Sequence, residues 1–144
     1  MAALTADQIV DRVRSLCAGP VFGLTEAVSW TSFDLQPDGN IDGVYRIPPP
    51  SSQRSIGGFA FTEDRTDVLQ IWIARKHHMD TNAARTRLLQ DVHSLTAAVM
   101  RDGHTSGGDY GVLDEGRGHA IAEVPRADYL TLRVTLPINY DCQF

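Results

Sequence analysis

Apolar and polar residues repeat with two different periods along the chain, and the sharpest change of period falls between Asp67 and Gly103. Residues 68–75 (VLQIWIAR) are rich in β-branched and aromatic side chains, which indicates a strand. Successive side chains of a strand point to opposite faces, so Leu69, Ile71 and Ile73 form one apolar face that we expect to pack on a helix. The other face is mixed and is expected to be half-open: Val68, Gln70, Trp72 and Ala74.

The pattern then changes to that of a helix. Asp80 or Thr81 can cap the first turn, because either side chain can accept a hydrogen bond from a free backbone N–H. Gly103 is expected to end the helix in the left-handed conformation that glycine adopts readily. Between these ends, apolar residues recur every three or four positions, as one stripe of a helix requires: Ala84, Leu88, Val92, Leu95 and Val99.

A second amphipathic helix is predicted near the N-terminus, over Thr5–Cys17. Thr5 and Gln8 have the spacing of a capping box, in which each side chain accepts from the backbone of the other residue. Gly19-Pro20 then ends the helix, since proline cannot continue it. The predicted buried stripe consists of Ile9, Val13, Leu16 and Cys17.

The remaining pattern predicts strands and turns. The clearest strand is Tyr129–Ile138, in which apolar and polar residues alternate strictly, and the charged turn Glu63–Thr66 is expected to complete a hairpin. Further strands or extended segments are predicted at Val21–Leu35, Val44–Ile47, Ile56–Thr62 and Ala120–Val124. The fold class is therefore α+β: a single mostly antiparallel sheet with two helices packed on one face, in one domain over residues 1–144.

Pro48–Ser55 (PPPSSQRS) interrupts this order. Its three prolines lack backbone donors and favour extended geometry, while its serines favour exposure, so we predict a protruding loop. Two interpretations stay open: a plain surface excursion, and an arm that reaches a neighbouring subunit.

Composition narrows the classes of function. The chain has 144 residues, of which 42% are hydrophobic and 22% charged, as in an ordinary globular domain. Its net charge of −5 offers no global attraction for nucleic acid, so sequence-specific nucleic-acid binding is not expected. No apolar run approaches a membrane span and the N-terminus lacks the pattern of a signal peptide, so we expect a soluble protein made in a cytoplasm.

Few residues suggest chemistry. Cys17 and Cys142 lie in no CxxC motif, and reduced thiols are the simpler interpretation, although a disulfide stays open. His77 and His78 are adjacent on a strand end and would point apart, so a metal site that includes Asp80 or His93 is not favoured. Nothing matches a catalytic triad or a phosphate loop. We therefore expect no catalytic residue, no cofactor and no metal.

The segment Gln36–Gly43 (QPDGNIDG) offers one alternative. Asp38, Asn40 and Asp42 have the spacing of the first half of a calcium loop. The twelfth position needs a bidentate glutamate and is Pro49, and no helix flanks the loop. A plain turn is the favoured interpretation, and cation binding stays open.

The layout of the whole chain resembles the tail terminator proteins of long-tailed bacteriophages, which are also called tail completion or tail-to-head joining proteins. Four features carry the resemblance. They are the N-terminal helix LTADQIVDRVRSLCAG, the loop IPPPSSQRSIGG, the strand DVLQIWIARK followed by the helix DTNAARTRLLQDVHSLTAAVM, and the closing strand YLTLRVTLPINYD.

This resemblance implies a structural virion protein at the head–tail junction, assembled in the host cytoplasm. It implies a homohexameric ring that caps the tail tube protein on one side and meets a head-side connector or neck protein on the other; a head-closure role is a close variant. The family has no catalytic residues to carry over, so no enzyme activity is expected. A ring needs one patch to meet a different patch of the next subunit, and our candidates for that contact are Pro49, Arg54, Gln70, Trp72, Arg75, Arg85, Arg87 and Phe144.

A hypothesis of another class is a small cytoplasmic enzyme or ligand-binding domain. Its site would lie on the open face of the sheet, near Trp72, Tyr129 and Arg133. A concave pocket with converging polar groups would favour this alternative, since such pockets are the usual place of small-molecule sites.

Overall fold

The structure is a computed structural model that describes residues 5–19, 22–26, 42–57, 62–77, 79–104, 110–123 and 129–143, with the backbone alone described at 52–57, 62–63 and 142–143. The fold is α+β, as predicted. Its elements follow in the order α1 (Ala6–Ala18), β1 (Thr25–Glu26), β2 (Val44–Arg46), β3 (Ser51–Gly57), β4 (Thr62–Lys76), α2 (Thr81–His104), β5 (Tyr110–Val112), β6 (Gly118–Glu123) and β7 (Tyr129–Gln143).

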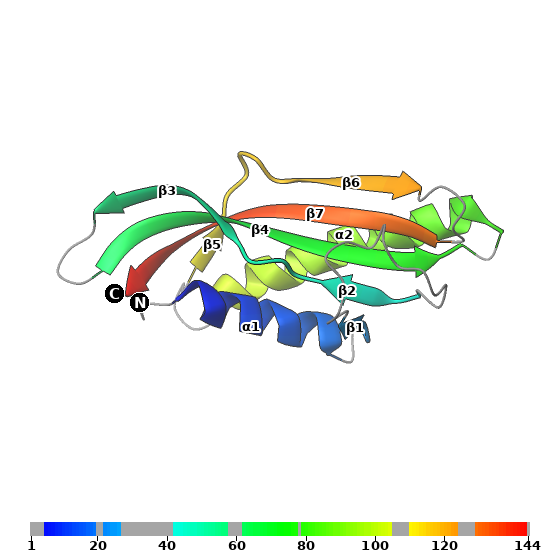
Figure 1. Cartoon of the computed structure of the whole chain (residues 1–144), viewed down its shortest axis with the longest axis horizontal. Coiled ribbons are helices and arrows are strands. Elements are labelled where there is room, and N and C mark those ends of the chain that lie inside the picture. Colours follow the sequence, from blue (N-terminus) through cyan, green and yellow to red (C-terminus); the bar gives the residue numbers. More distant parts are fainter. Residues whose placement is uncertain are drawn as a thin grey trace.

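Two long strands form the centre of the sheet. β4 and β7 have 15 residues each and pair antiparallel along their whole length, from Thr62 opposite Gln143 to Lys76 opposite Tyr129. The other edge of β4 carries β2 and β3, and the other edge of β7 carries β5 and β6 (Figure 1). These pairings are antiparallel, whereas β1 pairs parallel with β2.

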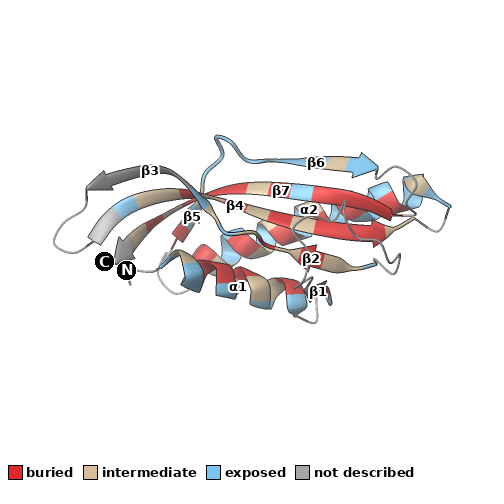
Figure 2. Cartoon of the chain, in the orientation of Figure 1, coloured by how far each residue is buried: buried red, intermediate tan, exposed pale blue. Residues whose placement is uncertain are grey.

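The core lies between one face of this sheet and the helices. Leu69 and Ile71 of the predicted apolar face are fully buried and belong to one core cluster with Leu88 of α2. Figure 2 shows buried residues along β4 and β7 and on both helices. Both helices reach this face of β4: Val10 of α1 lines a small hollow with Leu69, and Asp91 of α2 bonds to Arg75. Burying this face supplies the main drive for folding.

The helix starts follow the sequence signals. In α1, Thr5 N donates to Gln8 Oε1 at 2.9 Å and Gln8 N donates to Thr5 Oγ1 at 3.3 Å, which confirms the capping box. In α2, Asp80 Oδ1 accepts from Ala83 N at 3.0 Å. These bonds satisfy donors that a helix N-terminus otherwise leaves free.

The predicted end of α2 at Gly103 was wrong, because α2 continues to His104 and Gly103 is buried within it. A Cβ atom on Gly103 would lie 2.5 Å from the carbonyl oxygen of Tyr110 and 2.7 Å from two of its ring carbons. Glycine is therefore needed here for the close approach of β5 to α2, rather than for a left-handed backbone.

The predicted loop Pro48–Ser55 was also wrong in its second half. Only Pro48–Pro50 are irregular, and Ser51–Gly57 form β3, which pairs antiparallel with β4. The predicted strand Ile56–Thr62 was placed too late in the chain, since β3 ends at Gly57 and β4 begins at Thr62. The predicted turn Glu63–Thr66 lies inside β4 instead. The strand β3 forms because it pairs with the long strand β4. Its serine-rich sequence has no alternation of apolar and polar residues from which this pairing could be predicted. Most of the predicted extended segment, at residues 27–35, lies outside the described residues.

Candidate functional site

The sheet face turned away from the helices carries a row of side chains on three neighbouring strands. Arg46 of β2 is opposite Trp72 of β4, and Trp72 is opposite Arg133 of β7. Directly opposed residues in a sheet share a face and lie within contact range. We call this set the Arg–Trp–Arg row; it consists of Arg46, Trp72 and Arg133.

The row holds positive charge beside an aromatic ring. The guanidinium carbon of Arg133 lies 5.9 Å from the ring centroid of Trp72, which is within the range of a cation–π interaction. Arg46 is half-buried, and its Nε atom is buried with no hydrogen-bond partner among the described residues. An unsatisfied buried donor costs about 1–3 kcal/mol. Neither arginine forms an ion pair with a carboxylate of a described residue.

The rest of this face is open only in part. Gln70 and Thr135 are opposite each other beside the row, and both are half-buried. In the other direction Ala74 and Thr131 are buried, so the expectation of a half-open face fails at this end. The accessible part of the face is therefore its middle, where Trp72 is half-buried and Arg133 is exposed.

Arg75 was predicted to lie on the contact surface, and this was wrong. Alternation along β4 places it on the helix side with Ile71 and Ile73, where it is 8% exposed. Its Nε atom donates to Asp91 Oδ2 at 3.0 Å and its Nη2 atom donates to Asp91 Oδ1 at 3.2 Å. This forked geometry pairs the charges fully, so Arg75 holds α2 against the sheet.

The other predicted contact residues are scattered. Arg85 and Arg87 are exposed on α2, and Arg85 Nη2 lies 3.9 Å from Glu123 Oε1 in a weak surface pair. Pro49 is exposed between β2 and β3. Arg54 belongs to β3 by its backbone, but its side chain lies outside the described residues, as does the whole of Phe144. The structure thus brings Gln70 and Trp72 together and separates them from the basic residues of α2.

Sequence reasoning missed Arg46 as a contact residue and named Arg133 only for the ligand-binding alternative. The alternation in β7 placed Arg133 on the polar face, which was a usable signal. Arg46 lies in a strand of three residues, and its position opposite Trp72 depends on a register that such a short segment cannot reveal.

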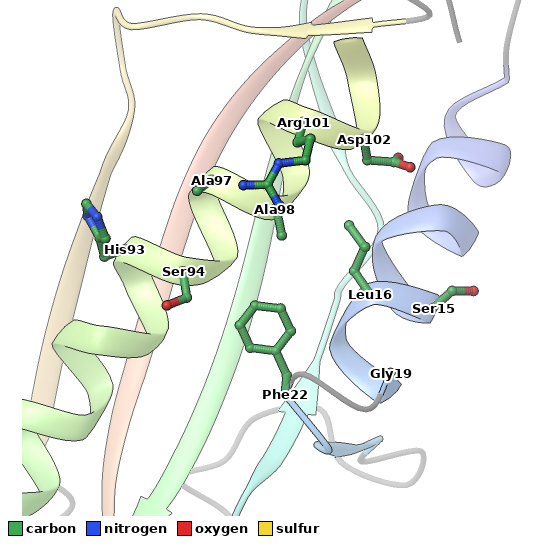
Figure 3. Close-up of a pocket in the computed structure, with 10 residues that line it drawn as sticks. All are labelled: Ser15, Leu16, Gly19, Phe22, His93, Ser94, Ala97, Ala98, Arg101 and Asp102. Atoms are coloured by element: carbon green, nitrogen blue, oxygen red, sulfur yellow. The ribbon is translucent and has the colours of Figure 1, made fainter. Parts of the chain in front are cut away.

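A mainly apolar pocket lies on the helical side, between α1 and α2 (Figure 3). Its volume is about 650 Å³. Asp102 on its rim is already engaged by Arg12 Nε at 3.0 Å and by the Tyr110 hydroxyl at 2.7 Å. The lining residues are Ser15, Leu16, Gly19, Phe22, His93, Ser94, Ala97, Ala98, Arg101 and Asp102. This pocket is remote from the face on which the ligand-binding alternative placed its site, where Tyr129 is buried.

Two buried groups hold their protons firmly. Cys17 is a free thiol, and burial, followed by the nearby negative charge of Glu26, raises its pKa to about 12. The same two causes raise the pKa of Tyr45 to about 12, and its hydroxyl donates to Glu26 Oε2 at 3.5 Å. A thiol with a raised pKa forms little thiolate, so Cys17 is a core residue rather than a nucleophile.

Among the described residues, no group of three or more histidine, cysteine or acidic side chains could hold a metal ion. Of the possible calcium ligands, Asp38 and Asn40 lie outside the described residues, and Asp42 Oδ1 accepts from Lys76 N at 3.1 Å. Within the same part of the chain, neither helix combines the length and the apolar character needed to cross a membrane.

Comparison with known proteins yields no match, either to a protein-family model or to a curated protein. Hypotheses of function therefore depend on the geometry of this chain and on the layout of its sequence.

Proposed function

We propose that this chain is the subunit of a ring that terminates the tail tube of a phage-like particle and joins it to the head-side connector. The observation that carries the proposal is the Arg–Trp–Arg row. Tryptophan and arginine are the residue types most often found at the energetic centre of protein interfaces. Here they lie together on a sheet face, and the described residues of the same subunit provide no counter-charge to the two arginines.

The shape of the sheet supports the same proposal. In Figure 1 the ends of β3, β4 and β7 project beyond α1, so this part of the sheet lies outside the helix layer. A projecting set of paired strands can reach a neighbouring subunit without disturbing the core. Of the two interpretations of Pro48–Ser55, the proposal takes the one in which this region extends toward a neighbour, although Ser51–Gly57 form the strand β3.

Ring closure sets the kind of contact that is needed. A closed ring of identical chains forms when one patch binds a different patch of the next copy at a rotation that closes. The sequence resemblance implies six subunits, with the tail tube protein below and the connector above. In this proposal the protein is a virion component of the head–tail junction that is assembled in the host cytoplasm, and it has no catalytic activity.

Imaging of the purified full chain tests the proposal. Negative-stain electron microscopy should show rings with a central opening, and Trp72→Ala should reduce their number because the aromatic contact is lost. Gln90→Ala is the matched control, since it removes an exposed side chain of α2 that is not a candidate contact residue. Separate single particles of monomer size for the wild-type chain would contradict the proposal.

A second candidate function is the binding of a small apolar ligand. The pocket between α1 and α2 favours it, because its volume of about 650 Å³ lies in the range of small-molecule sites. Ala97→Phe would fill this pocket from an exposed position on α2. If the pocket binds ligands, a hydrophobic fluorescent dye should bind to the wild-type chain and not to this variant; equal dye binding to both would reject this function.

A further inference from the structure

We infer that the Arg–Trp–Arg row receives the acidic turn Asp114–Glu115 of a second copy of this chain. The inference rests on the proposed function, which requires self-assembly, and it names the two patches that meet. Both patches consist of described residues, and their charges are opposite.

The row needs a partner that brings carboxylates. Arg46 Nε is removed from water and has no acceptor among the described residues, and Arg133 has its guanidinium on the indole of Trp72 without a carboxylate from that part of the chain. Guanidinium groups bind carboxylates in a planar, charge-assisted geometry that is stronger than a neutral hydrogen bond. A neighbouring carboxylate would therefore supply the missing counter-charge to the two guanidinium groups that flank Trp72.

The acidic turn has the complementary chemistry. Asp114 is 90% exposed in its side chain, and Glu115 is exposed beside it. Asp114 has a charged contact with Arg117 Nη1 at 3.4 Å. Leu113 is an exposed large hydrophobic residue next to the two acids, so the turn offers an apolar side chain for the indole as well as carboxylates for the arginines.

The turn is held in place before any contact forms. Arg117 N donates to Asp114 O at 3.2 Å, Leu113 N donates to Pro137 O at 2.9 Å, and Gly116 has the positive φ of 84° that such a turn requires. Figure 1 shows the link between β5 and β6 rising beyond the sheet. A projecting turn with a fixed backbone loses little conformational freedom when it binds.

The two patches are distinct parts of the sheet. The turn joins the strands on the β7 edge, whereas the row crosses the sheet from Arg133 in β7 to Arg46 in β2. The acidic edge of one copy can therefore meet the basic row of the next. This is the heterologous contact that generates a ring, and repeated copies use both patches of every subunit.

A charge swap tests the inference. Arg133→Glu places a carboxylate in the row, and the double variant Asp114→Arg/Glu115→Arg makes the turn basic; the changed residues are exposed, so the fold should persist by circular dichroism. Each variant alone should need a concentration about tenfold or more higher than the wild-type chain to assemble, because like charges then meet. An equimolar mixture should restore assembly in rings that alternate the two variants, since the carboxylate at position 133 then meets a basic turn, and the unchanged row of the other variant meets an unchanged acidic turn.

Thr86→Glu/Gln90→Glu is the matched control, because it makes the same change of two charge units at exposed positions on α2 and should leave assembly unchanged. If this control loses assembly as strongly as Arg133→Glu does, the effect is a general one of charge and the inference is overturned. If Arg133→Glu forms rings at the same concentration as the wild-type chain, the proposed contact between row and turn is overturned and the proposed function stays intact. If Arg133→Glu loses assembly and the mixture does not restore it, the inference is overturned in favour of a different acidic partner for the row. If the wild-type chain never assembles, both the inference and the proposed function are rejected.

Discussion

At the scale of single residues, the structure separates arginines that look alike in the sequence. Arg75 is buried in an ion pair with Asp91, Arg87 is exposed on a helix, and Arg133 covers a tryptophan. The sequence shows the number of arginines but not their partners, because Arg75 and Asp91 are 16 positions apart and meet only when α2 packs on β4. This is why the predicted contact surface included Arg75, which holds the fold together instead.

The Arg75–Asp91 pair gives a prediction for stability. Arg75→Met should lower the free energy of unfolding by about 3–5 kcal/mol, because it leaves the Asp91 carboxylate buried without a counter-charge. Adding Asp91→Leu should recover part of this loss, since no buried charge then remains. Urea unfolding followed by circular dichroism measures both values, and a loss below about 1 kcal/mol for Arg75→Met would show that the pair is not buried as described.

Cys17 and Tyr45 give a prediction for pH dependence. Their ordinary pKa values, 9.0 for the thiol and 10.0 for the phenol, are raised to about 12 in the folded chain, so the folded state keeps protons that the unfolded state releases. Their contribution to stability is complete below about pH 9 and is lost as the pH rises toward about 12. The free energy of unfolding should therefore fall over this range, and the fall should be smaller in Cys17→Ala/Tyr45→Phe; identical slopes would contradict the raised pKa values.

At the scale of elements, the helices, the two long strands and the short strands β2 and β6 could be predicted, whereas the bounds of β3 and the existence of β5 could not. The capping box at Thr5 and the apolar stripe of α2 are local signals, and local signals survive folding. The position of β3 depends on pairing with β4, and the Arg–Trp–Arg row depends on the registers of two pairings. Such registers are set by contacts that are distant in sequence, so Trp72 was the one member of the row that could be predicted as a contact residue.

The approach of β5 to α2 gives a prediction at this scale. Gly103→Ala should lower the free energy of unfolding by about 1–3 kcal/mol, because its Cβ would overlap backbone and ring atoms of Tyr110. Gly111→Ala in β5 is the matched control, since no atom lies within 4 Å of the Cβ that it adds. Equal urea midpoints for the two variants would mean that β5 does not lie against α2.

At the scale of the whole molecule, two unlike patches of one sheet connect the fold with the proposed ring. The acidic turn lies on the β7 edge, and the basic row crosses the sheet from β7 to β2, so each copy offers two different patches to its neighbours. The net charge of −5 hides this arrangement, because it sums over both patches. The order of elements could be predicted from the sequence, but the placement of the patches required the sheet topology.

The mass of the full chain in solution tests the central claim, self-assembly into a ring, most directly. Sedimentation equilibrium over a series of concentrations should give a species of six times the 15.8 kDa of one chain. The same measurement on Arg133→Glu should show a shift toward the single chain, because the basic row has lost its complementarity. A wild-type mass that stays at 15.8 kDa over the whole series would contradict the account.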